Sequence, residues 1–304
     1  MECKLTIFTP TYNRAYTIEK LYKSLLSQTN KNFEWIVVDD ESSDETENIF
    51  SAMIKYNNDF PIHYFKQKHG GKHRAINRAL ELAKGKFFFI VDSDDHLLSD
   101  AVEKIYGWIN KIDNIHYLAG VAGLRIDSNN KVIGSYYKKS TEDNWIEASN
   151  LERRKYDLLG DKAEVYRTDI LKKFKFPEFE NEFFVTEAVV WDAIAYNGYK
   201  MRWYNQPIYV TDYLQDGLTC NGANEIKGAL ANYNGFCYYV RQCIKVKSSI
   251  EYITDFRRFN KVAKMKGRNH KERANDLKIS LVRYCIYKFL KMPILYIFRK
   301  ITRW

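Results

Sequence analysis

The first hundred residues of the chain alternate short apolar runs with stretches of helical periodicity. A short apolar run between turn signals is typical of a strand, and apolar residues spaced three and four apart predict a helix. The expected strands are residues 5–9, 35–38, 62–65 and 87–91, and the expected helices are residues 17–28, 44–56 and 72–84. Such a series predicts an α/β fold, in which a mostly parallel sheet is covered by helices on both faces and ligands bind at the carboxyl ends of the strands.

The pattern changes in the middle of the chain, where longer strands and turns replace the regular alternation. Strands are expected over 117–126 and 131–137, and helical periodicity returns near 187–196, so this half is predicted to be mixed α/β. After it the sequence pattern is helical. We therefore expect a large domain over 1–223 and a helical, basic extension over 224–304.

The positive charge of the chain is concentrated at its C-terminal end. Of the net charge of +10, residues 257–304 hold 15 Lys and Arg against two acids, whereas the rest holds 33 Lys and Arg against 36 Asp and Glu. A nucleic-acid-binding protein spreads or stripes basic charge over its fold. We therefore expect no nucleic-acid partner, and a basic tail with a partner of its own.

Residues 277–304 mix apolar and aromatic side chains with seven Lys and Arg and no acid. Their longest uncharged run, 292–298, is far shorter than the roughly 20 apolar residues that cross a bilayer. Such a segment can lie on an anionic membrane surface as an interfacial helix. The equal alternative is a solvated basic helix packed on the large domain or on a partner subunit.

The cysteines and the N-terminal residues indicate the cellular compartment in which the protein is expected. The five cysteines include no CxxC pair and no Cys/His cluster with metal-ligand spacing, which favours free thiols in a reducing environment. The N-terminus carries Glu2 and Lys4 and leads directly into a strand, so no cleavable signal is recognised. We expect a cytoplasmic protein.

Three carboxylates, Asp92, Asp94 and Asp95, follow the apolar strand 87–91 with only Ser93 between them. Their mutual repulsion is costly without a cation. Mg²⁺ or Mn²⁺ prefers oxygen ligands and completes its shell with phosphates and water, so one or two carboxylates suffice. An acidic turn that leads into the next helix is the alternative, and the neighbouring motifs favour the metal.

Two further motifs follow predicted strands or open a predicted helix. Asp39 is expected to accept a hydrogen bond from the imide of a uracil base while Asp40 supports the turn, and Asp44 is expected to cap the next helix. Tyr12 could form an aromatic wall of the base-binding site, although a tyrosine in such a chain more often belongs to the core. Residues 70–74 (GGKHR) place cationic side chains at a helix N-terminus, where anions bind.

Four motifs together resemble the family 2 glycosyltransferases, which have the GT-A fold. They are residues 10–14 (PTYNR), 37–44 (VVDDESSD), 70–72 (GGK) with Asn77, and 91–95 (VDSDD), in the family's order and approximate spacing. The resemblance covers roughly residues 3–220 and implies a Rossmann-like, nucleotide-binding mixed sheet flanked by helices. The helical segment after residue 224 lies outside the shared core.

The resemblance implies that the first loop and Asp39 hold the nucleotide, and that the DXD motif after the fourth strand binds the diphosphate and donor sugar with Mn²⁺ or Mg²⁺. The implied nucleotide and donor residues are Thr9, Pro10, Tyr12, Arg14, Asp39, Lys72, His73, Asp92, Ser93 and Asp94. The implied metal ligands are Asp94, Asp92 and Asp95. Asp161, Lys162 and residues 212–217 look like further site-lining segments in a subgroup of the family.

The family usually places a Glu-Asp pair before a helix, and an acid there deprotonates the acceptor hydroxyl. In the matching stretch, 184–192, Ala188 replaces the second acid. The resemblance thus implies Glu187 as the base, with Asp192 as the lesser candidate one turn further on. The alternative is that Glu187 only caps the helix.

The implied activity is metal-dependent, inverting transfer of a hexose or N-acetylhexosamine from a nucleotide sugar, expected to be a UDP-sugar. The acceptor is a hydroxyl of a saccharide or a lipid-linked molecule, with cell-surface polysaccharide as the family default. The expected location is the cytoplasm, peripheral on the inner face of the plasma membrane. The rival functions are a sugar nucleotidyltransferase and a non-enzymatic scaffold associated with membrane or RNA.

Overall fold

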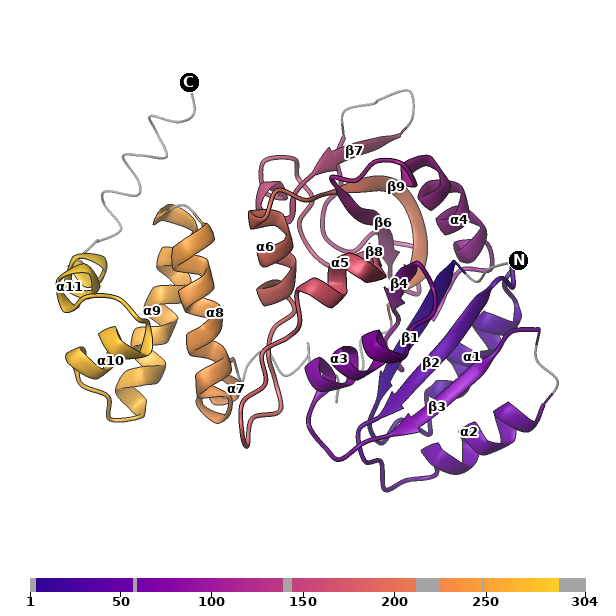
Figure 1. The fold of residues 1–304 in the computed structure, drawn as a ribbon, viewed down its shortest axis with the longest axis horizontal. Helices are drawn as coiled ribbons and strands as arrows, with labels where there is room; N and C mark the ends of the chain where they lie inside the picture. Colours follow the sequence, from indigo (N-terminus) through magenta and orange to yellow (C-terminus); the bar gives the residue numbers. More distant parts are fainter. Residues whose placement is uncertain (1–3, 57–58, 139–143, 212–224, 248, 290–304) are drawn as a thin grey trace. The chain divides into compact units, whose positions relative to one another are not determined.

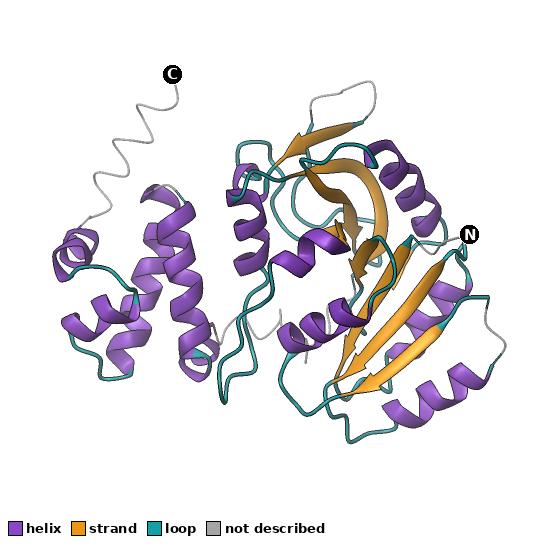
Figure 2. Ribbon diagram, viewed as in Figure 1, coloured by secondary structure: helices purple, strands orange, loops and turns teal. Residues whose placement is uncertain are grey.

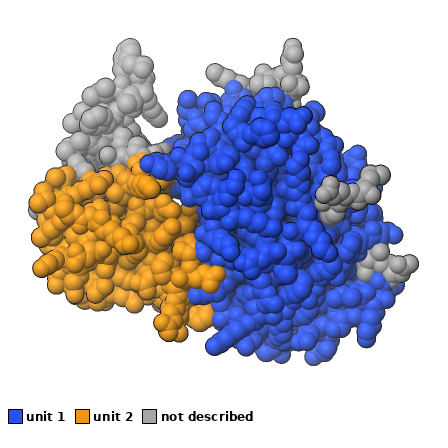
Figure 3. Space-filling model, viewed as in Figure 1, with its two compact units in different colours: residues 1–176, 190–221 blue, residues 177–189, 222–304 orange. Residues whose placement is uncertain are grey.

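A computed structural model describes residues 4–56, 59–138, 144–211, 225–247 and 249–289. The chain divides into two compact units (Figure 3). Unit 1 comprises Met1–Phe176 and Val190–Asn221, and unit 2 comprises Pro177–Val189 and Gly222–Trp304. The chain enters unit 2 for the last time close to the predicted domain boundary, and the earlier segment 177–189 also groups with this unit.

The first four strands of unit 1 are parallel neighbours, in the order β3-β2-β1-β4 (Figures 1 and 2). They are β1 (Leu5–Thr11), β2 (Phe33–Asp39), β3 (Ile62–Lys66) and β4 (Phe87–Ile90). β1, β2 and β4 are buried almost throughout, as expected of parallel strands that are covered on both faces, whereas β3 at the edge is only partly buried. The predicted parallel sheet is confirmed.

The second half of the sheet is mixed. After β4 the order continues β8-β6-β9-β5, with β7 paired to β9, and β8 runs antiparallel to both of its neighbours, β4 and β6. These strands are β5 (His96–Leu97), β6 (Leu118–Ile126), β7 (Trp145–Ala148), β8 (Lys162–Arg167) and β9 (Lys200–Val210). The predicted mixed α/β half is thus confirmed.

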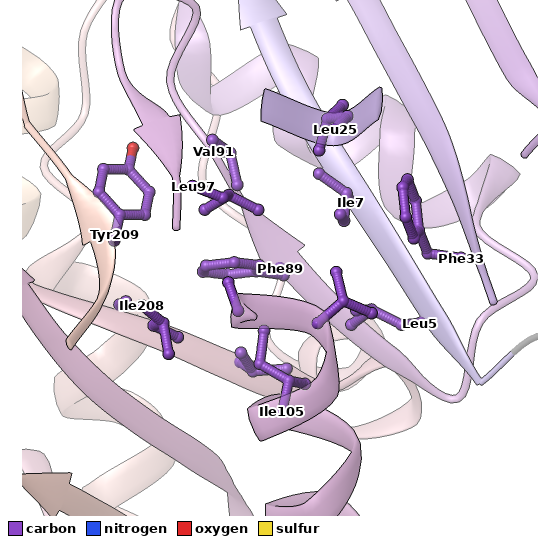
Figure 4. Close-up of a cluster of buried hydrophobic side chains, with 14 of the residues drawn as sticks. Leu5, Ile7, Leu25, Phe33, Phe89, Val91, Leu97, Ile105, Ile208 and Tyr209 are labelled. Carbon is purple, nitrogen blue, oxygen red and sulfur yellow. The ribbon is translucent and has the colours of Figure 1, made fainter. Parts of the chain in front are cut away.

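Helices cover both faces of the sheet. The helices of unit 1 are α1 (Ile18–Leu26), α2 (Thr46–Lys55), α3 (Lys72–Leu82), α4 (Ala101–Ile112) and α5 (Thr168–Lys173), and α6 (Ala188–Tyr196) begins in unit 2 and runs into unit 1. Side chains of α1, α2 and α4 join one buried cluster with alternate residues of the strands, such as Leu5, Ile7 and Phe89 (Figure 4). The intervening Phe8 and Phe88 stack on each other on the opposite face, where α3 and α5 lie (Figure 1). This alternation is the period of two that a strand imposes.

Unit 2 is helical, as predicted for the end of the chain, and has its own core around Phe256, Phe259 and Tyr284. Its helices are α7 (Glu225–Ala231), α8 (Tyr233–Val246), α9 (Ser249–Met265), α10 (His270–Asp276) and α11 (Leu281–Phe289). Within the described residues, none of the helices is both long enough and apolar enough to traverse a bilayer.

The strand predicted over 131–137 is wrong. Only Val132 forms a bridge, with Ile126, and the backbone then turns at Gly134, where φ is 74°. A Cβ at Gly134 would lie 2.2 Å from the carbonyl oxygen of Leu159, so this left-handed turn and close approach require glycine. The segment therefore bonds first to the end of β6, through Ile133, and then to the carbonyl of Leu159, through Ser135, instead of extending along one strand.

Candidate active site

Three loops converge at one edge of the sheet because β1, β2 and β4 are parallel and end together. Thr11 is paired with Asp39, and the amide of Asp40 donates to the carbonyl of Thr11 at 2.9 Å. The amide of Val91 donates to the carbonyl of Phe8 at 2.8 Å. The first loop (residues 12–14), the Asp39-Asp40 pair and the DXD motif (residues 92–95) therefore share one rim, as the sequence predicted.

Side chains tie the first two loops together. The amide of Asn13 donates to Ser42 Oγ at 2.8 Å, and Asn13 Oδ1 accepts from the amide of Ser43 at 2.8 Å. Asp44 accepts from the amide of Ala15 at 3.0 Å and from that of Thr46, the first residue of α2, at 3.1 Å. The N-cap of α2 is Glu45 and not Asp44 as predicted, and Asp44 bonds the first amide of the helix from one position earlier. Burial raises its pKa, but the Thr46 hydroxyl and these amides outweigh burial and hold that pKa below its ordinary value.

The Asp39 carboxylate is fully buried at the end of β2. It accepts from the amide of Ser42 at 2.8 Å and from the hydroxyl of Tyr64, whose pKa is raised first by burial and then by Asp39. A carboxylate has about four lone-pair sites, so two donors leave acceptor capacity for a base.

Asp40 organises the turn that opens α3. Its carboxylate accepts from the amides of Gly70 at 2.9 Å and Gly71 at 2.7 Å, and it lies 2.9 Å from His69 Nδ1. The half-exposed ring of Tyr12 packs on the His69 ring, with centroids 4.6 Å apart. Tyr12 is thus an available aromatic surface at this rim and not a core residue.

The three cationic candidates at the start of α3 differ in placement. Lys72 Nζ lies 2.6 Å from Asp92 Oδ1. The ring of His73 is buried, and Arg74 folds back to donate to the carbonyl of Gly70 at 2.6 Å. Lys72 is therefore the cation that faces the DXD motif, and His73 could contribute to an anion site through its backbone N–H.

The three carboxylates of the motif turn to different cations. Besides the contact of Asp92 with Lys72, Asp94 lies 3.9 Å from the Arg14 guanidinium and Asp95 lies 3.7 Å from that of Arg125. Ser93 between them is buried. Among the described residues, no three His, Cys, Asp or Glu side chains are grouped so that they could hold a metal by themselves.

Burial and mutual repulsion separate the pKa values of these acids. Burial raises the pKa of Asp92, but Lys72 and Arg125 outweigh it and hold the pKa below its ordinary value. Burial, then the charge of Asp92, raises the pKa of Asp94. The same two causes, opposed by Arg125, raise the pKa of Asp95 to about 7. A cation beside Asp94 would relieve this repulsion, and it would need phosphate oxygens as further ligands.

The two candidate bases lie in different units. Glu187 is partly exposed in unit 2, directly before α6. Asp192 is buried in unit 1 and accepts from Asn150 Nδ2 at 2.6 Å. The partly exposed Glu187 is the more accessible of the two.

The segment before Glu187 is anchored to the start of α8 within unit 2. Asn232 Oδ1 accepts from the amides of Phe183 at 2.8 Å and Phe184 at 2.9 Å. The buried Glu182 carboxylate accepts from the amides of Asn234 at 2.7 Å and Gly235 at 2.8 Å. The helical extension therefore holds the residues that carry the candidate base.

The remaining predicted segments have mixed outcomes. Lys162 is buried, and its Nζ donates to the carbonyl of Leu159 at 2.7 Å. Burial, then the charge of Arg153, lowers its pKa to about 8. Asp161 is exposed, and residues 212–217 lie outside the described residues.

Sequence reasoning missed Arg125 and Tyr209, which lie behind the DXD motif. Tyr209 Oη donates to Asp95 at 2.7 Å and accepts from the amide of Asp92 at 3.0 Å. Both residues sit in strands whose pairing joins distant parts of the chain, and no local motif marks them.

The model of the family described as "Glycosyl transferase family 2" matches residues 6–174, which is more than half of the chain. The chain belongs to this family. The predicted enzyme class, a glycosyltransferase, is thereby confirmed over the nucleotidyltransferase and scaffold alternatives.

Curated relatives share about a third of their aligned residues with this glycosyltransferase. It is 30% identical over 191 residues to a Campylobacter jejuni protein named GalNAc(5)-diNAcBac-PP-undecaprenol beta-1,3-glucosyltransferase, covering 62% of this chain and 58% of the relative. It is 35% identical over 100 residues to the Bacillus subtilis putative teichuronic acid biosynthesis glycosyltransferase TuaG, covering 33% of this chain and 39% of TuaG. The match thus spans little more than half of the first relative's length.

Solved structures confirm the GT-A fold. S. aureus TarS 1-349 superposes with a TM-score of 0.60 at 22% identity, covering 86% of this chain and 71% of TarS. The Pyrobaculum calidifontis mannosyltransferase PcManGT, solved with GDP-Man and Mn²⁺, has a TM-score of 0.54 at 15% identity, covering 100% of this chain and 80% of its own.

Proposed function

We propose that this glycosyltransferase is a metal-dependent, inverting enzyme that moves a hexose or N-acetylhexosamine from a UDP-sugar to a hydroxyl of a saccharide or lipid-linked acceptor in cell-surface polysaccharide synthesis. The observation that carries the proposal is the shared rim of Tyr12, Asp39, Lys72 and the DXD motif. The names of the relatives support the acceptor class, and TarS structures with UDP and UDP-GlcNAc support the donor.

The nucleotide side of the site is assigned to the first loop and Asp39. Asp39 accepts the imide N–H of uracil, and the exposed face of Tyr12 walls the base. The Thr9 hydroxyl already accepts from the Trp35 indole at 3.0 Å, and Thr9 and Pro10 both belong to β1, so we assign them to supporting the start of the first loop through their backbone. Arg14 lies on the side of Asp94 and faces the diphosphate.

The diphosphate side is assigned to Asp92, Ser93, Asp94 and Lys72. Asp94 is the principal ligand for Mn²⁺ or Mg²⁺ and Asp92 the second, because Asp95 is engaged by Tyr209 and Arg125. A divalent cation bound there supplies charge neutralisation for the departing diphosphate. Lys72 balances Asp92 and, with the helix N-terminus behind it, attracts the anionic leaving group.

The acceptor side is assigned to Glu187. Its carboxylate takes the proton of the acceptor hydroxyl while that oxygen forms a bond to the anomeric carbon and the bond from that carbon to UDP breaks. Attack opposite to the leaving group inverts the anomeric configuration. The buried, hydrogen-bonded Asp192 is the lesser candidate.

We assign the end of unit 2 to an anionic membrane surface. In α11 the side chains of Leu281, Val282 and Ile286 are 45%, 70% and 56% exposed, whereas Tyr284 is fully buried. The helix also carries Arg283, and residues 257–304 are strongly basic. An apolar face with basic neighbours matches an interfacial helix on the cytoplasmic leaflet, and residues 290–304 of the predicted segment lie outside the described residues.

Isothermal titration of UDP into the full chain tests the proposal, with Mn²⁺ and with EDTA, followed by assay of UDP-sugar hydrolysis. Metal-dependent UDP binding together with hydrolysis of a UDP-sugar is expected. Absence of binding by UDP under both conditions would reject UDP as the nucleotide, and GDP and dTDP would then be titrated in the same way.

A further inference from the structure

The hydroxyl of Tyr209 joins the two ends of the DXD motif. It accepts a hydrogen bond from the amide of Asp92 at 3.0 Å and donates one to Asp95 Oδ2 at 2.7 Å. The ring is fully buried near the end of β9, where Tyr209 is paired with Leu97 of β5 (Figure 4). The motif therefore connects β4 to β5, and the Tyr209 side chain is bonded to its first and last acidic residues.

Arg125 packs on Tyr209 and restrains its ring. The two residues are partners in the β6–β9 pairing, and the guanidinium carbon of Arg125 lies 4.0 Å from the centre of the Tyr209 ring. Arg125 Nε donates to the carbonyl of Lys162 at 3.0 Å, and Arg125 also lies 3.7 Å from Asp95. The cation thus holds the ring from its face and balances the charge of the acid that the ring binds.

The exposed fractions of the three acids agree with this arrangement. The side chain of Asp95 is 5% exposed, whereas those of Asp92 and Asp94 are 26% and 21% exposed. A buried carboxylate that accepts from a tyrosine and lies beside an arginine is engaged by the protein and offers little surface to a further cation. Asp95 is therefore built as an anchor, and its two neighbours as the accessible acids.

We infer that Tyr209 is a positioning residue of the donor site, which holds residues 92–95 in the shape that receives a metal-bound diphosphate, and that Asp95 is the anchor of this loop and not a metal ligand. The inference rests on the proposed function, since it assumes a metal at Asp94 and Asp92. Groups that orient metal ligands typically change metal affinity or activity by about 10- to 100-fold when they are removed.

The test is Mn²⁺ affinity, measured by electron paramagnetic resonance of the free ion, in Tyr209→Phe with UDP present. The phenylalanine ring keeps its packing against Arg125 but leaves the Asp92 amide and the Asp95 carboxylate without their shared partner. The expected loss is about tenfold in Mn²⁺ affinity. Tyr204→Phe is the matched control, because Tyr204 is a buried tyrosine of the same strand that stacks on Trp108 at 4.4 Å, and its Mn²⁺ affinity should equal that of the wild type.

Asp95→Asn and Asp94→Asn provide a second measurement that is independent of Tyr209. In Asp95→Asn the side-chain amide oxygen would still accept from the tyrosine hydroxyl, so the expected loss in Mn²⁺ affinity is within about threefold, whereas Asp94→Asn should abolish binding. Equal Mn²⁺ affinity in Tyr209→Phe and wild type, or equal losses in the two Asp variants, would overturn the inference alone. A wild-type chain that binds neither Mn²⁺ nor UDP would overturn the proposed function and the inference with it.

Discussion

The rim of unit 1 and helix α11 of unit 2 use charge in opposite ways. At the rim, acids and bases are largely buried and paired at short range, as in the contact of Asp92 with Lys72 at 2.6 Å. On α11, Val282 and Ile286 are exposed beside basic residues. Buried, fixed charges favour one small ligand of defined geometry, whereas exposed apolar and basic side chains suit a fluid surface that adapts to them.

Asp94→Asn gives the largest expected effect and tests the rim by itself. Loss of the principal metal ligand should lower sugar transfer on the order of a thousandfold, because the charge that develops on the leaving diphosphate is no longer neutralised. Steady-state assay with Mn²⁺ measures it, and titration with UDP should show no metal-dependent heat. Binding to anionic vesicles should stay at the wild-type level, and a joint loss of both would break the comparison.

Glu187→Gln is expected to lower kcat roughly a hundredfold or more, because the amide cannot take the proton of the acceptor. The affinity for UDP should not change, since Glu187 is assigned to the acceptor side. Asp192→Asn serves as the comparison, with a much smaller loss of kcat. The reverse ranking of the two variants would transfer the role of base to Asp192.

The double variant Val282→Glu/Ile286→Glu tests α11 by itself. Two acids on the exposed face should weaken binding to vesicles that contain phosphatidylglycerol by about tenfold or more, through lost apolar contact and charge repulsion. Co-sedimentation measures the binding, and hydrolysis of the UDP-sugar in solution should be unaffected. Unchanged sedimentation would favour the alternative of a basic helix that packs on a partner.

Asp44→Ala gives the smallest expected effect and concerns the scaffold of the rim. Loss of the hydrogen bonds from Thr46 and Ala15 should lower the free energy of unfolding by about 1 kcal/mol at pH 7, as measured by urea denaturation. The pKa of Asp44 is lowered in the folded chain, so its contribution is present above the ordinary pKa and disappears as the pH falls through the folded one. The difference in unfolding free energy between variant and wild type should therefore vanish in acid. A difference that persists there would mean that the destabilisation has other causes.

The sequence by itself determined the parallel half of the sheet and the loops that bear the motifs. Strand and helix periodicities are local, and parallel strands end at one edge, so Asp39 and Asp92 were expected at one rim and lie there. The strand expected over 131–137 failed because the apolar and polar pattern does not report the close approach that Gly134 makes to another loop.

Only the tertiary structure decided which charged groups face one another. The pairing of Arg125 with Tyr209 joins strands that are far apart in the chain, and the inward orientation of His73 depends on the packing of α3. The grouping of residues 177–189 with the helical unit depends in the same way on two contacts. The Glu182 carboxylate bonds the first turn of α8, and Asn232 bonds the amide of Phe184. Periodicity within a segment sets its conformation, whereas the partner of a buried charge is set by strand register and helix packing, which no single segment encodes.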